Sequence, residues 1–359
     1  DLHSFPTRRS SDLEIHMKRI ISFDVMRTIA VFAVVFEHIA GQNFFFSFPS
    51  FEWEVRNIYI SLGRGFFSLF LMISGALFLS PEKPLVIKKL YSKNIFRIIY
   101  VFLFWSIIYV VYIEGLNSGP KVAFLSVLKG PPHFWFLKMM IGLYVMIPLL
   151  RVVAANREAL HYLVAFLGVT TFVIPAVFDY IELLNGQRQF FLEDFYNAFG
   201  LQSLGYVGYF VLGHYLYVYS LGKRTKYLIY ILGVLGLIGS AIATSVYSHQ
   251  IGETSGFFFD DFHFLVLFET LAAFLFIKDH CTGGSPTFQR VIISLSTCSF
   301  GVYLIHPLIM YTFDEYFGLN STSFNPLFFI PVFDIIIFSL SFALVKLIFY
   351  IPFMNKMVR

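Results

Sequence analysis

Long apolar stretches separated by short polar segments run through most of this chain. Each stretch is about 17–25 residues long, which is the length an α-helix needs to cross a bilayer at about 1.5 Å per residue. Strands of a membrane β-barrel would instead show short segments of alternating apolar and polar residues. The pattern therefore predicts an all-α, polytopic bundle of transmembrane helices. We expect about ten spans, at residues 21–41, 62–80, 95–114, 133–151, 160–178, 203–220, 227–247, 257–277, 291–312 and 328–352.

The charged residues of the loops fall into two sets that predict the orientation of the spans. If the N-terminus faces the cytoplasm, the cytoplasmic loops hold most of the lysines and arginines, including Lys88, Arg157 and Lys223. The opposite loops then hold only Arg56, Arg64, Lys121, Lys129 and Arg188. Basic residues concentrate in cytoplasmic loops of membrane proteins. Both termini are therefore expected to be cytoplasmic.

Composition supports the membrane interpretation. The chain is 57% hydrophobic and 13% charged, with a mean hydropathy of +0.73, whereas a soluble domain carries about 25% charged residues. The net charge of +4 does not indicate a nucleic-acid partner, because the basic residues lie in short loops where they act as orientation signals. We expect a protein surrounded by membrane lipid. Two cysteines, Cys281 and Cys298, are too few for a disulfide framework.

The first sixteen residues differ from the rest of the chain. They are polar around Pro6–Asp12 and lack the apolar core of a signal peptide. We interpret residues 1–16 as a non-native or disordered leader and expect the native chain to start at Met17. Residues 17–359 are expected to form a single transmembrane domain.

The first span carries four ionisable residues, Asp24, Arg27, Glu37 and His38. Ionisable groups within a span are costly, so each is a candidate for function. His38 follows Arg27 by eleven positions, which places both on one face of a helix, about 16 Å apart along its axis. Asp24 lies close enough to pair with Arg27, whereas Glu37 is turned about 100° from His38. A neutral imidazole is a suitable general base, although the same residues also fit interfacial anchors and a packed histidine.

Other polar and aromatic residues lie at or within later spans. Lys93 and Arg97 lie where the chain enters the third span, and they fit either a phosphate-bearing ligand or an orientation signal. Trp135 and Tyr144 fit a substrate platform or an interfacial belt. His306 precedes Pro307 within the ninth span and fits a structural or a functional role. The histidines are scattered over different segments, and we expect no metal site.

Five segments of the chain, taken in order, carry a resemblance to a known family. They are Phe23–Ala30 with His38, Phe66–Leu79, His133–Leu137 with Tyr144 and Pro148, Gly208–Gly213, and Ser299–His306. With these segments the chain resembles the acyltransferase-3 family of integral membrane acyltransferases, which includes bacterial sugar O-acetyltransferases. The resemblance extends from about Lys18 to Tyr350 and is most specific in the spacing of Arg27 and His38.

The resemblance implies an acyltransferase of the cell (inner) membrane that moves an acetyl group. The donor would be cytoplasmic acetyl-CoA, and the acceptor a hydroxyl of a cell-envelope sugar or polysaccharide precursor. His38 and Arg27 would be catalytic, with Glu37 beside them. Lys93, Arg97 and Asp24 would bind the donor, and Trp135, Tyr144, Tyr303 and His306 the substrate. The family often has an arginine where this chain has Asn94, a departure that Lys93 is expected to offset.

Two other functions remain open at this point. A transporter or flippase for a glycan or lipid-linked sugar would use the same polar stripe as a pathway, but would release its substrate unchanged. A non-catalytic partner in a glycan-assembly complex would tolerate the loss of His38. The acceptor, the acyl chain and the oligomeric state are left open by the sequence.

Overall fold

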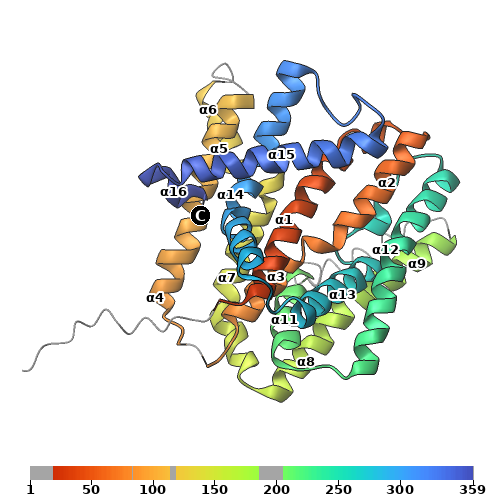
Figure 1. Cartoon of the computed structure of the whole chain (residues 1–359). Coiled ribbons are helices and arrows are strands. Elements are labelled where there is room, and N and C mark those ends of the chain that lie inside the picture. The colour runs from red at the N-terminus through yellow and green to blue at the C-terminus, as the bar shows by residue number, and fades with distance from the viewer. Residues whose placement is uncertain (1–18, 83, 114–118, 186–204, 359) are drawn as a thin grey trace, which may run out of the picture.

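The structure is a computed structural model that describes residues 19–82, 84–113, 119–185 and 205–358. The predicted leader at residues 1–16 lies outside the described residues, as does Arg188. Within these ranges the chain forms helices and no strands, so the all-α prediction is confirmed. Figure 1 shows the helices gathered into one bundle with α1 (Ile21–Gly41) near its middle.

The remaining helices follow α1 in chain order. They are α2 (Phe51–Gly63), α3 (Leu69–Phe78), α4 (Ile87–Lys89), α5 (Phe96–Ile113), α6 (Pro120–Lys129), α7 (Trp135–Ala154), α8 (Arg157–Gly168), α9 (Ile174–Asn185), α11 (Gly205–Val218), α12 (Lys223–Ile251), α13 (Phe264–His280), α14 (Pro286–Phe317), α15 (Pro326–Ile348) and α16 (Pro352–Val358).

Among the described residues, eight helical stretches are long and apolar enough to cross a bilayer. Two predicted spans coincide with shorter helices, α11 with 14 residues and α13 with 17. Both are packed inside the bundle, α11 against α3 and α13 against α12. Every predicted span thus overlaps a helix, and the chain is an integral membrane protein.

One predicted span begins earlier than the sequence indicated. The expected span at 62–80 is the second half of a stretch from Phe51 to Phe78, in which α2 and α3 are joined by a 3-10 turn at Arg64–Phe66. Gly65 lies in this turn against α13, where an added Cβ would be 2.8 Å from side-chain atoms of Glu269. The polar residues of α2 conceal its helix in a hydropathy reading, and the turn brings Arg64 into the bundle.

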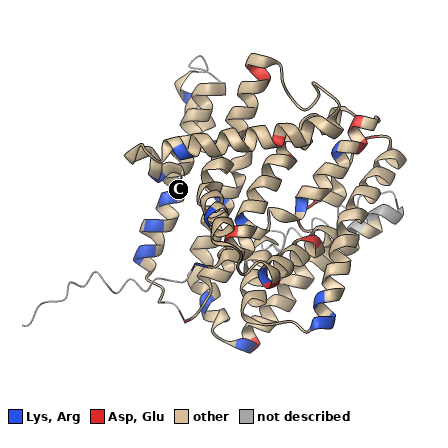
Figure 2. Cartoon of the chain, viewed as in Figure 1, with Lys and Arg blue, Asp and Glu red and all other residues tan. Residues whose placement is uncertain are grey.

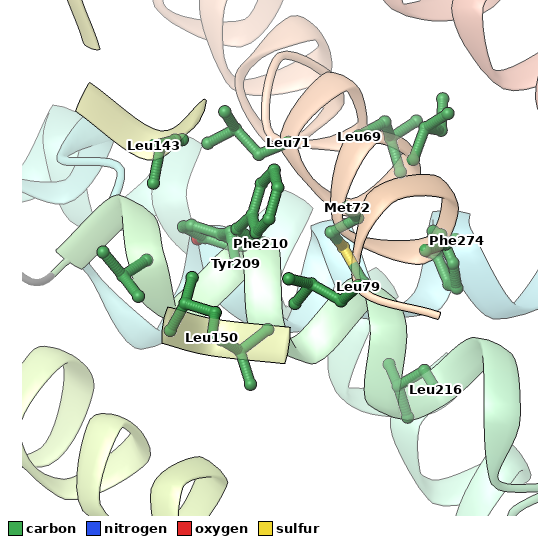
Figure 3. Close-up of a cluster of buried hydrophobic side chains, with 14 of the residues drawn as sticks. Leu69, Leu71, Met72, Leu79, Leu143, Leu150, Tyr209, Phe210, Leu216 and Phe274 are labelled. Atoms are coloured by element: carbon green, nitrogen blue, oxygen red, sulfur yellow. The ribbon is translucent and has the colours of Figure 1, made fainter. Parts of the chain in front are cut away.

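Two hydrophobic clusters hold the helices around α1. Figure 3 shows part of the first, where α3, α7, α11 and α13 meet through residues such as Leu71, Leu143 and Phe210. Here α3 and α11 cross with their backbones in contact, because a Cβ at Gly75 would lie 1.7 Å from the Phe210 carbonyl oxygen and one at Gly213 would lie 2.1 Å from that of Met72. Small residues permit this approach between membrane helices. The second cluster joins the other half of α1 to α5, α14 and α15.

Charge is distributed unevenly along the bundle. In Figure 2 the basic residues lie mainly along α4 and at the lower ends of α8 and α12, whereas acidic residues are prominent near the upper ends of α2 and α14. This polarity is what the loop charges of the sequence predict for a membrane protein. We refer to the two ends as the basic end and the acidic end of the bundle.

Candidate functional site

Two cavities lie beside the two halves of α1. The Arg27 cavity is lined by Arg27, Lys93, Arg97, Tyr144 and Tyr303, together with apolar residues of α3, α5 and α7. The His38 cavity is lined by Glu37, His38, Arg64, His133, Trp135 and Tyr311, among others. The predicted stripe on the first span therefore contributes Arg27 to one cavity and His38 to the other, and α1 forms a wall common to both.

The start of α7 separates the two cavities. His133 and Trp135 line the His38 cavity, whereas Phe136, immediately after them, lines the Arg27 cavity. The hydroxyl of Tyr303 in α14 donates a hydrogen bond of 2.6 Å to the carbonyl oxygen of His133. The rings of Phe136 and Tyr303 pack with their centroids 5.6 Å apart. We call these four residues the aromatic partition.

His38 contacts a second histidine behind the cavity wall. Its Nδ1 lies 2.8 Å from Nε2 of His306, and the two rings stack with centroids 5.0 Å apart. His306 is 0% exposed and lines neither cavity, whereas His38 is half-buried and lines the His38 cavity. The ring of His133 is 6.3 Å from that of His38. The structure thus joins His38 and His306, residues 268 positions apart in the chain.

Glu37 contacts Arg64 in an ion pair on the floor of the His38 cavity. Arg64 also donates to the carbonyl oxygen of Phe259, and its Nε lies 3.5 Å from Oδ1 of Asp261. Asp261 precedes α13 and accepts a hydrogen bond of 2.9 Å from Tyr206. Burial raises the pKa of the Asp261 carboxyl, an effect that the nearby Arg64 guanidinium opposes. Two acids therefore surround one guanidinium, and of these three residues Glu37 and Arg64 line the cavity.

The sequence interpretation did not assign a role to Arg64, which it placed in an outer loop. The signal available was the pair Gly63 and Gly65 around an arginine within an otherwise apolar run. That pattern indicates a break in a helix at a charged residue.

Asp24 forms an ion pair with Arg27 outside the cavity lining. Its carboxylate is 1% exposed and accepts hydrogen bonds from Arg27 at 3.4 Å, from Arg19 at 2.6 Å and from Ser296 at 2.6 Å. The expected pairing of Asp24 with Arg27 is confirmed. Asp24 lines neither of the two cavities, so its geometry fits support of Arg27 better than direct contact with a ligand.

Lys93 and Arg97 lie where the Arg27 cavity meets a third, basic cavity. Both residues line both cavities, and so does Asn94. The basic cavity also contains Lys89 and, from α16, Lys356. Lys93 lies in a π-helical turn at Leu90–Ile95 that leads into α5. Lys356 follows the last span, and the sequence interpretation counted it only among the basic residues that orient the chain.

The four residues predicted to bind substrate lie in the His38 cavity, in the Arg27 cavity and behind His38. Trp135 is 39% exposed and lines the His38 cavity, which suits a flat surface for stacking. Tyr144 and Tyr303 line the Arg27 cavity. His306 is buried behind His38. In the described ranges, no group of three or more His, Cys, Asp or Glu side chains is arranged to hold a metal ion.

The arrangement suits the transfer of a group from an anionic molecule to a polar one. Four cations line the basic cavity, which adjoins the Arg27 cavity. The imidazole of His38 and the ring of Trp135 lie in the His38 cavity, on the other side of the aromatic partition. Guanidinium and ammonium groups bind phosphates, and a neutral imidazole accepts protons near neutral pH.

Comparisons with known proteins bear on this chemistry. A family model described as an acyltransferase domain, acyltransferase family 3, matches residues 20–346. No curated protein and no solved structure matches the chain. The match covers nearly all of the described helices and contains both Arg27 and His38, so the chain belongs to the acyltransferase-3 family of membrane acyltransferases.

Proposed function

We propose that this protein moves an acetyl group from cytoplasmic acetyl-CoA to a hydroxyl of a cell-envelope sugar. The observation that carries the proposal is the placement of Arg27 and His38 on one helix, in two cavities that meet at the aromatic partition. The residues between them span about 16 Å along the helix axis, so an elongated donor can be held at one end and react at the other.

The donor would bind from the basic end. Its phosphate groups would lie against Lys89, Lys93, Arg97 and Lys356 in the basic cavity, where charge-assisted contacts replace lost hydration. The narrow acyl-bearing arm would follow the Arg27 cavity between Tyr144 and the apolar residues of α5. The thioester would then reach the aromatic partition beside His38.

The acceptor would bind in the His38 cavity. A sugar ring can stack on Trp135, while Glu37 and Gln42 accept or donate hydrogen bonds to its hydroxyl groups. The one guanidinium of this lining, Arg64, is already paired with Glu37 and Asp261. This lining favours a sugar hydroxyl over a phosphate or carboxylate as the group nearest to His38.

His38 would act as a general base. Its unprotonated nitrogen would take the hydroxyl proton as the acceptor oxygen attacks the thioester carbonyl carbon. When the tetrahedral species collapses, the carbon–sulfur bond breaks, and the thiolate of CoA takes the proton from His38. Binding both substrates at the partition contributes by proximity. An acetyl-histidine intermediate is the alternative route within this proposal. It predicts labelling of the protein when no acceptor is present.

The experiment measures the transfer of labelled acetyl from acetyl-CoA into the glycan fraction of membranes that contain the wild type, His38→Ala or His280→Ala at matched expression. His280 is exposed and lies outside the described cavities, which makes it a matched control. Label with the wild type and with His280→Ala, but not with His38→Ala, is expected. Equal label with all three would remove His38 from the chemistry. Movement of an unmodified glycan without acetylation would instead support a transporter.

A further inference from the structure

The orientation of the His306 ring is fixed by its own helix. Nδ1 of His306 lies 3.0 Å from the carbonyl oxygen of Val302, four residues earlier in α14. A carbonyl oxygen only accepts hydrogen bonds, so this nitrogen must carry a proton. Pro307 lacks an N–H, which leaves the carbonyl of Tyr303 without its usual helical donor and gives the ring a second acceptor nearby.

This contact determines the protonation of the next ring. In a neutral imidazole only one nitrogen carries a proton, so Nε2 of His306 is an acceptor. Nδ1 of His38 lies 2.8 Å from it and must therefore be the donor. The remaining nitrogen of His38, Nε2, then has a free lone pair. Because Nδ1 faces the buried His306, Nε2 is the nitrogen available to the cavity that His38 lines.

Burial excludes the alternative in which His306 is permanently charged. His306 is 0% exposed, and within the described part of the chain no ion pair joins it to a carboxylate. An unpaired charge at such a place in a membrane protein costs several kcal/mol. The neutral pair, with one proton on Nδ1 of each ring, satisfies both hydrogen bonds at no such cost.

We propose that His306 is a positioning residue that holds His38 in the tautomer with a bare Nε2 facing the acceptor hydroxyl. This inference rests on the proposed function, in which His38 is the base. His306 touches neither cavity, so it acts through His38 rather than on substrate. The role parallels that of the acid that orients a catalytic histidine in hydrolases, but here a neutral ring fills it.

The pair also disperses the charge that forms during transfer. When Nε2 of His38 takes the proton of the hydroxyl, the proton on Nδ1 moves toward Nε2 of His306. The positive charge is then shared between two rings that are held by the carbonyl of Val302. When the carbon–sulfur bond breaks, the proton on Nε2 passes to the CoA thiolate and the Nδ1 proton returns. No proton is gained or lost by the pair over one cycle.

Two amide substitutions separate this role from simple packing. The amide of His306→Gln reaches the position of Nε2 and can accept from His38. The shorter amide of His306→Asn reaches only the position of Nδ1, so it keeps the contact with Val302 but loses the acceptor. We expect His306→Asn to lower kcat by about 100-fold and His306→Gln by about tenfold or less. KM for acetyl-CoA should stay within about twofold in both, because the donor cations are untouched.

Nitrogen-15 NMR of histidine-labelled protein in nanodiscs tests the tautomer without any assay of transfer. The wild type and His306→Gln should show His38 protonated at Nδ1 and bare at Nε2, and His306→Asn should lose this preference. Unfolding temperatures of the wild type and both His306 variants, with His280→Asn as the control, report whether the fold is intact. A wild-type His38 protonated at Nε2 would overturn the proposal, as would equal kcat values for the Gln and Asn variants. Should the wild type show the expected tautomer but transfer no acetyl group, the proposed function fails and the tautomer assignment stands.

Discussion

Removal of the guanidinium of Arg64 is the most informative perturbation of the His38 cavity floor. Arg64→Gln leaves the carboxylates of Glu37 and Asp261 close together without their shared cation. The side chains are 29% exposed for Arg64, 16% for Glu37 and 11% for Asp261, so the network is mostly but not fully buried. Breaking a buried pair costs about 3–5 kcal/mol and breaking a surface pair about 0–1 kcal/mol. We expect a loss of about 2–3 kcal/mol in the free energy of unfolding.

A double-mutant cycle isolates the coupling between Glu37 and Arg64. Glu37→Gln alone leaves Arg64 with Asp261 and should cost about 1 kcal/mol. The variant that combines Arg64→Gln with Glu37→Gln should be more stable than the sum of the single losses predicts by about 1–2 kcal/mol, because Glu37→Gln removes a carboxylate that Arg64→Gln leaves unpaired. Unfolding by SDS titration in mixed micelles measures each value. Additivity within about 0.5 kcal/mol would refute the account.

The pH dependence of the same variant provides a second test. The pKa of Asp261 is raised by burial and held down by Arg64, so loss of Arg64 raises it further. An acid with a raised pKa in the folded state binds more protons folded than unfolded, and the folded state therefore gains stability as pH falls through that range. Arg64→Gln should recover part of its lost stability across the acidic range, as pH falls through the raised pKa of Asp261. A loss of stability that is constant over this range would mean that Arg64 does not influence the pKa of Asp261.

Two further variants test the fold and the donor site. Gly75→Ala should destabilise the protein by about 3 kcal/mol or more, because its Cβ would lie 1.7 Å from the Phe210 carbonyl oxygen; Gly142→Ala, with nothing within 4 Å, is the matched control and should be neutral or slightly stabilising in the same SDS titration. Lys356→Gln should raise KM for acetyl-CoA about fivefold with kcat unchanged, since one cation near a phosphate at a wet surface contributes about 1 kcal/mol. Lys223→Gln, on an exposed surface away from the described cavities, should have no effect on KM, and equal effects of the two lysines would contradict a donor site at α16.

The sequence predicted the parts of this molecule that depend on local pattern. Apolar length located the helices, and the helical repeat predicted that Arg27 and His38 share one face of α1; in the structure the two residues line two different cavities beside this helix. The pairing of Asp24 with Arg27 also follows from a spacing of three residues. These features depend on neighbours within one helix, which a single sequence displays directly.

Contacts between segments that are distant in the chain could not be predicted from the hydrophobic and polar pattern. The sequence gives no indication that His306 lies behind His38, because their contact depends on how α14 packs against α1. It also left Arg64 in a loop, because the turn between α2 and α3 interrupts an apolar run without ending it. Pairings of this kind depend on helix packing, and a single sequence shows no record of which helices are neighbours.

The aromatic partition has a consequence for the electrical behaviour of the protein. It separates two cavities that lie beside opposite halves of α1, a helix long enough to span the bilayer. Water in both cavities would be nearly equipotential with the solution on its own side, so most of a transmembrane voltage would fall across the thin layer around Tyr303 and His133. A full elementary charge that crosses 100 mV exchanges about 2.3 kcal/mol with the field. In the proposed mechanism, the hydroxyl proton that His38 takes up and passes to the thiolate would move within this layer, so the membrane potential would act on the transfer step itself.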